Sequence, residues 1–137
     1  MIQRVQSVFL LVVVLCGCCL WMFPFVNYEG YASLLLRSPM DLLPIANYLS
    51  ILIALLCVFM YKNRPLQIRF CQILMALNAI LIFVMRLFSN QLYEHDFEKG
   101  KFLLPSYLPL VAIAMAFVAS RYIKKDEELV RSADRIR

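Results

Sequence analysis

Glycine and histidine are scarce in this chain of 137 residues, and each shortage excludes a class of site. Only three glycines occur, so the chain has no glycine-rich loop of the kind that binds phosphates through backbone N–H groups. The single histidine, His95, has no plausible nucleophile beside it in the sequence. Nucleophilic catalysis needs a base within hydrogen-bond reach of the nucleophile. The sequence therefore predicts a protein that is not an enzyme.

Charged residues are also few, at 17% of the chain, whereas hydrophobic residues make up 63%. Soluble domains average about 25% charged and 45–50% apolar residues. The apolar excess falls into four runs, each near the roughly 20 residues that cross a hydrocarbon layer about 30 Å thick. Most of each run is apolar on every side, whereas a helix of a soluble protein keeps one polar face. We therefore expect an all-α membrane protein whose four transmembrane helices cover about residues 5–26, 42–61, 70–88 and 102–123.

Proline and a capping side chain together mark where two of these helices begin. Asp41 precedes Pro44 by three residues, and Ser106 precedes Pro109 by the same spacing. A carboxylate or hydroxyl can accept a free N–H of the first turn, and proline there loses no hydrogen bond. Both starts follow outer loops of similar size, which suggests two helical hairpins in a parallel arrangement. We expect the four helices together to form an antiparallel up-down bundle.

All five cysteines lie in the apolar runs rather than in the hydrophilic segments between them. We expect small packing residues, because cysteine is among the most buried residue types. The spacing offers neither a CxxC motif nor a histidine partner, so no metal or cofactor is predicted. The first run is longer than the apolar part of a signal peptide and has no small-x-small cleavage site, so we expect it to be retained. The cysteines are Cys16, Cys18, Cys19, Cys57 and Cys71.

A basic turn between the second and third runs sets the expected topology. Residues 62–69 carry three positive charges and no negative one. Short loops rich in Lys and Arg stay in the cytoplasm, which places both chain termini there as well. Ten of the fourteen Lys and Arg residues then lie inside. The residues that we expect to set this topology are Arg4, Lys62, Arg64, Arg69, Lys124 and Lys125.

Two polar residues lie within the third run. Asn78 sits near mid-depth, where it needs a partner; a hydrogen bond to a neighbouring helix would supply one. Arg86 is near the outer end, where its side chain can reach the interface. The alternative interpretation makes both residues the lining of a small path. None of the four runs contains an acidic residue or a histidine, which argues against a proton pump.

The segment around His95 is the one place with several residue types that bind metals. Glu94, Asp96 and Glu98 surround the histidine. One histidine with carboxylates offers too few soft ligands for a structural zinc site, so we predict a solvated loop. A weaker alternative is an enzyme that acts on lipid at the outer surface through His95.

Residues 124–137 form a hydrophilic tail that is predicted to be a short amphipathic cytoplasmic helix. Its apolar residues fall on one stripe and its basic residues load the helix end, which suits the helix dipole. One interpretation is an anchor on anionic lipid. The other is a docking helix, because four acidic residues suit a protein groove and make nucleic acid an unlikely partner. The predicted partner-binding residues are Leu129, Val130, Arg131, Ala133, Arg135, Ile136 and Arg137.

The two ends of the chain, Met1–Ser7 and Lys125–Arg137, resemble a bacterial membrane family catalogued as domain of unknown function 4293. The resemblance covers the whole chain and implies a four-span protein of the inner membrane of a Gram-negative bacterium. It implies no catalytic residue.

From these patterns we predict a non-enzymatic subunit of a larger membrane complex. Residues 1–123 would form the bundle and residues 124–137 would bind another membrane or cytoplasmic protein. The alternative is a small transporter or channel subunit with a polar path at Asn78 and Arg86. The sequence identifies no small-molecule substrate.

Overall fold

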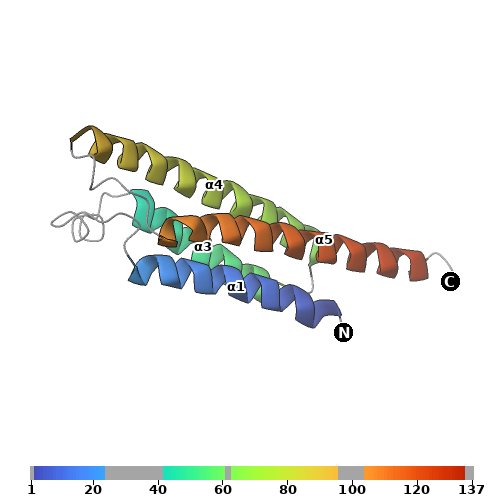
Figure 1. The fold of residues 1–137 in the computed structure, drawn as a ribbon. Coiled ribbons are helices and arrows are strands. Elements are labelled where there is room, and N and C mark those ends of the chain that lie inside the picture. The colour runs from blue at the N-terminus through green and yellow to red at the C-terminus, as the bar shows by residue number, and fades with distance from the viewer. Residues whose placement is uncertain (1, 24–41, 61–62, 96–103, 135–137) are drawn as a thin grey trace.

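The computed structural model describes residues 2–23, 42–60, 63–95 and 104–134, and in these ranges all regular structure is helical (Figure 1). A short 3-10 helix, η1, leads directly into the last long helix. The elements are α1 (Ile2–Met22), α3 (Leu42–Phe59), α4 (Arg64–His95), η1 (Leu104–Tyr107) and α5 (Leu108–Asp134).

The four long helices form an antiparallel bundle in which chain neighbours are also neighbours in space. α1 packs on α3, α3 on α4 and α4 on α5, and α5 closes the ring by packing on α1. The start of α1, the end of α3, the start of α4 and the end of α5 lie toward the same end of the bundle (Figure 1). We call this the terminal end of the bundle. The prediction of an all-helical bundle is confirmed.

Proline lies in the first turn of three helices, where its missing N–H is not needed. Pro44 and Pro109 follow the starts of α3 and α5 by two residues and one residue; of the two expected caps, Asp41 lies outside the described residues and Ser106 lies in η1. Pro65 is the second residue of α4, and Asn63 accepts the N–H of Gln67 just before it. α4 thus begins six residues before the expected membrane-spanning stretch at 70–88 and contains all of it.

The length and hydropathy needed to cross a membrane are met by two of the four predicted spans. They are Arg64–Leu87 and Leu104–Ser132. The helical stretches Gln6–Met22 and Leu43–Phe59 are apolar but shorter. Fewer than half of the residues in either longer stretch are buried within the bundle. Much of their apolar surface therefore faces outward.

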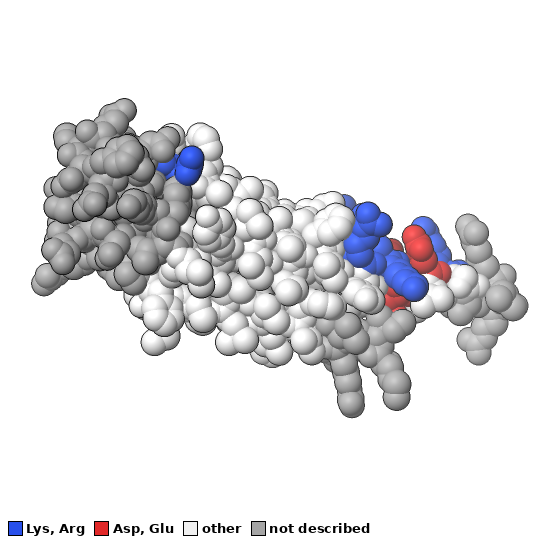
Figure 2. All heavy atoms as spheres, in the orientation of Figure 1, with Lys and Arg blue, Asp and Glu red and all other residues white. Residues whose placement is uncertain are grey.

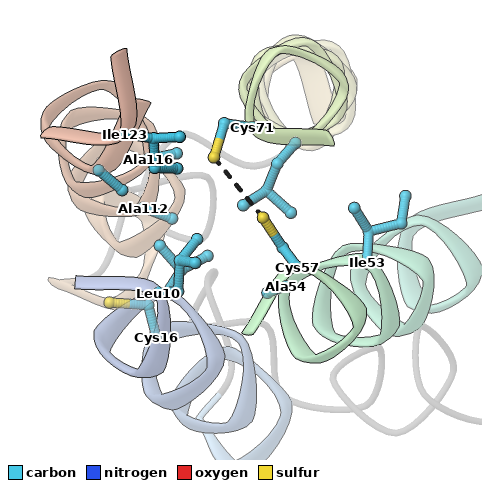
Figure 3. Close-up of a cluster of buried hydrophobic side chains, with 12 residues drawn as sticks. Leu10, Cys16, Ile53, Ala54, Cys57, Cys71, Ala112, Ala116 and Ile123 are labelled. Atoms are coloured by element: carbon cyan, nitrogen blue, oxygen red, sulfur yellow. Dashed lines mark hydrogen bonds between the residues drawn. The ribbon is translucent and has the colours of Figure 1, made fainter. Parts of the chain in front are cut away.

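Small side chains let the helices approach closely in the core. Ala112, Ala116 and Ala119 lie one helical turn apart on the buried face of α5. Figure 3 shows Ala112 and Ala116 on the side of α5 that faces Leu10 of α1. On α1, a Cβ added at Gly17 would lie 2.6 Å from Cγ1 of Ile51 on α3. Small residues at such contacts let helix backbones approach closely and pack well against one another.

Candidate functional site

The end of α5 extends beyond the packed bundle. Ile123 is fully buried, whereas Leu129 and Val130 are 50% and 43% exposed. The helix runs unbroken through these positions to Asp134, and its final turns project past the start of α1 (Figure 1). Two branched apolar side chains are thus presented on a part of α5 that the described residues leave about half exposed.

An ion pair fixes α5 to the start of α4 just before this projection. Nη2 of Arg64 lies 3.1 Å from Oδ2 of Asp126, and the two side chains are partly exposed, at 25% and 16%. Partly exposed pairs of this kind contribute at most about 1 kcal/mol to stability. The pair therefore serves mainly to place the tail beside the basic turn.

Charged side chains gather at the terminal end, whereas the middle of the face in Figure 2 is uncharged. Arg69, Lys124 and Lys125 are exposed there. Arg121 lies over the ring of Phe117, with Cζ 5.1 Å from the ring centroid. An arginine that covers an aromatic ring with its charge directed outward is typical of a residue at a lipid–water boundary.

Asn78 is buried in the core, with only 4% of its surface exposed. Its Nδ2 donates to Oγ of Ser50 on α3 and to the carbonyl oxygen of Leu74, each at 2.9 Å. This amide therefore joins α4 to α3. Arg86 lies two turns further along α4 and is exposed. The structure does not bring the two residues together.

Two further polar contacts were missed by the sequence analysis. Nδ2 of Asn47 donates to the carbonyl oxygen of Gly17 at 3.1 Å, and so joins α3 to α1. Nε2 of Gln67 donates to the carbonyl oxygen of Cys57 at 3.1 Å, and so joins α4 to α3. Asn47 and Ser50 stand in an apolar run, which is the signal that could have found them.

Several predicted site residues lie outside the part of the chain that can be described. Among the tail residues, Leu129, Val130 and Arg131 are exposed on α5. The backbone of Ala133 belongs to α5, and that of Arg4 belongs to α1, but neither side chain is described. The residues outside the described ranges are Lys62, Arg135, Ile136 and Arg137.

Metal-binding residue types do not cluster in the described part of the chain, where no three of His, Cys, Asp or Glu come together. The backbone of His95 ends α4, and its side chain is among those that are not described. The predictions about the His95 segment therefore stay predictions.

One comparison with known proteins identifies a family. A family model described as "Domain of unknown function (DUF4293)" matches residues 2–136. No curated protein and no solved structure matches the chain.

Proposed function

The chain belongs to the DUF4293 family, and we propose that it is a non-enzymatic subunit of a bacterial inner-membrane complex that binds another protein through the end of α5. The bundle would hold the chain in the bilayer with both termini in the cytoplasm. The surface of the bundle, the charge distribution and the course of α5 each support one part of this proposal.

Apolar side chains on the outside of all four helices support a bilayer location. Large exposed patches of this kind are rare on soluble monomers. The uncharged middle of the bundle agrees with it (Figure 2). Exposed examples, one or two from each helix, are Leu11 and Leu15 on α1, Leu52 on α3, Ile80 and Phe83 on α4, and Leu110 and Phe117 on α5.

The excess of Lys and Arg at the terminal end supports the orientation. Basic residues are retained on the cytoplasmic side of a membrane. The start of α4 and the end of α5 bring Arg64, Arg69, Lys124 and Lys125 to the same end of the bundle. Since α1 also begins there, one orientation satisfies all three segments.

The course of α5 is the observation that carries the docking proposal. Val130 lies seven residues beyond the buried Ile123, about 10 Å further along the helix axis. A tail that rests on anionic lipid must bend into the membrane plane, but α5 continues as one helix to Asp134. Leu129 and Val130 would therefore stand in water unless a protein covers them. A groove that binds an amphipathic helix suits this pair, with acidic groups for Arg131.

The transporter alternative has less support. The side-chain amide of Asn78 donates one N–H to Oγ of Ser50 and the other to the carbonyl oxygen of Leu74, so neither N–H is free to bind a solute. Arg86 is exposed rather than directed into the same core. A path through both residues would need surfaces from more than one copy of the chain.

Co-purification in mild detergent tests the docking proposal. We expect Val130→Asp to lose the partner that the unaltered protein retains. Ser132→Asp is the matched control, because it adds the same charge about 160° around the helix from Val130. If both variants retain the partner, or both lose it equally, the stripe at Leu129 and Val130 is not the docking surface.

A further inference from the structure

Two buried thiols face each other between α3 and α4. The Sγ atoms of Cys57 and Cys71 lie 3.7 Å apart, and neither residue has any exposed surface. Figure 3 shows both sulfurs pointing into the core from their separate helices. Formation of a disulfide needs the sulfurs to move closer by about 1.7 Å, since an S–S bond is near 2.05 Å long.

Gln67 holds the backbone of the two helices in register around this pair. Its side-chain amide donates to the carbonyl oxygen of Cys57, whose thiol lies 3.6 Å from the carbonyl oxygen of Gln67 itself. Cys71 follows Gln67 by one helical turn on α4. These polar contacts fix the two cysteine positions relative to each other, and the sulfur of Cys71 takes part in neither of them.

We propose that Cys57 and Cys71 form a reversible oxidation site, which becomes an intramolecular disulfide when a neutral, lipid-soluble organic hydroperoxide enters the bundle. The charge of the product favours this chemistry over metal binding. A disulfide is neutral, whereas two thiolates around a monovalent soft cation leave one net negative charge in an apolar interior, which is costly. A neutral oxidant also enters such an interior more readily than a charged one.

The oxidation balances with one hydroperoxide for each pair of thiols. One sulfur attacks the outer peroxide oxygen, the O–O bond breaks, and the alcohol leaves with a proton, which gives a sulfenic acid. The second sulfur then bonds to the first, and the hydroxyl leaves as water with the remaining thiol proton. The sulfurs lose two electrons in total, which the two peroxide oxygens gain. Exchange with cellular thiols reverses the reaction.

An unpaired polar group lies at the same end of the core. Gln6 of α1 is buried, and its Nε2 has no hydrogen-bond partner among the described atoms. It precedes Leu10 by one turn, and Leu10 belongs to the same buried cluster as the two cysteines. Its free N–H offers a hydrogen bond to an oxygen-bearing molecule that enters from the terminal end.

The disulfide would join α3 to α4 across the connection that leads to Arg64, the residue that holds α5 through Asp126. It closes a chain segment of about 15 residues, and cross-links of this size stabilise the folded state. Oxidation would therefore make the terminal end of the bundle more rigid, whichever partner that end binds.

Treatment of the protein in liposomes with cumene hydroperoxide tests this site. We expect two of the five thiols to become unreactive toward maleimide after denaturation, a Cys57–Cys71 cross-linked peptide in mass spectrometry, and full recovery with dithiothreitol. The oxidised protein should melt at a higher temperature than the reduced protein. Cys71→Ser, which is nearly isosteric, should show neither the cross-linked peptide nor the rise in Tm.

Cys18→Ser is the matched control, because Cys18 is exposed on α1. We expect this variant to oxidise at Cys57 and Cys71 as the unaltered protein does. The proposal is overturned if Cys18 oxidises while Cys57 and Cys71 keep reactive thiols. It is also overturned if Cys57 or Cys71 forms a disulfide between two chains, seen as a dimer on a non-reducing gel. Neither result depends on whether the end of α5 binds a partner.

Discussion

The packed bundle and the projecting end of α5 use similar residue types in opposite ways. In the bundle, Leu10 and Ile123 are fully buried and Asn78 has a hydrogen-bonding partner on the next helix. At the end of α5, Leu129 and Val130 have no such cover from the described part of the chain. Substitutions in the bundle should therefore change the stability of the protein, whereas substitutions in the projection should change binding with little effect on stability.

Gly17→Val should have the largest effect on stability. Its Cβ would meet Ile51 Cγ1 at 2.6 Å, so α1 and α3 must move apart or Ile51 must change rotamer. Overpacking of this kind costs about 1–3 kcal/mol. Unfolding by denaturant in detergent micelles measures the free energy of unfolding. The neighbouring Cys18→Val, on the exposed side of α1, should change it little. Equal losses for both variants would show that the close approach of Gly17 to Ile51 is not responsible.

Asn78→Leu should have the next largest effect. It removes the hydrogen bond to Ser50 and leaves that hydroxyl without its donor. Interhelical hydrogen bonds in membranes contribute about 0.6–2 kcal/mol. A double-mutant cycle with Ser50→Ala, measured by the same unfolding assay, should recover a coupling energy in this range.

The same variant separates the two function classes. If Asn78 only joins helices, proteoliposomes that contain the unaltered protein should show no solute flux that Asn78→Leu abolishes. A flux that disappears in Asn78→Leu while the protein stays folded would favour the transporter alternative.

Arg64→Gln should destabilise the protein by less than about 1 kcal/mol, because its pair with Asp126 is partly exposed to solvent. Its effect on partner binding should be larger than its effect on stability, since the pair places α5 beside the basic turn. Asp126→Asn should behave alike in both assays. If either variant unfolds the protein, the pair is a structural element of the bundle instead.

Val130→Asp should change the free energy of unfolding least, by no more than about 0.5 kcal/mol, since it alters an exposed site with few contacts. Partner retention should nevertheless be lost. A large drop in stability would mean that Val130 packs on the bundle, and the contrast between the two regions would fail.

Composition and proline spacing predicted the helical bundle because a run of about 20 apolar residues has few folded options in lipid. The apolar surroundings of Asn78 in its run likewise predicted that its side chain needs a hydrogen-bond partner on a neighbouring helix. Ser50, Asn47 and Gln67 were not identified as its equivalents, because pairing between helices depends on rotation and register. Rotation and register follow from packing contacts such as that of Gly17 on Ile51 between α1 and α3, which one sequence does not reveal.

The course of the tail was also beyond the sequence. A helix from Lys124 onward was expected, but both a lipid-bound and a docked position agreed with its stripe and its charges. The unbroken α5 is the observation that supports our proposal of a docked tail, because a continuous helix carries Leu129 away from the bundle along its own axis.

Photo-crosslinking in intact cells tests the central claim most directly. A photoreactive residue at position 129 should give one discrete protein adduct, and Val130→Asp should abolish it. The same residue at Leu110, an exposed position nearer the other end of α5, should give lipid adducts only. Lipid adducts alone at position 129 would contradict the account and place the tail on the membrane surface.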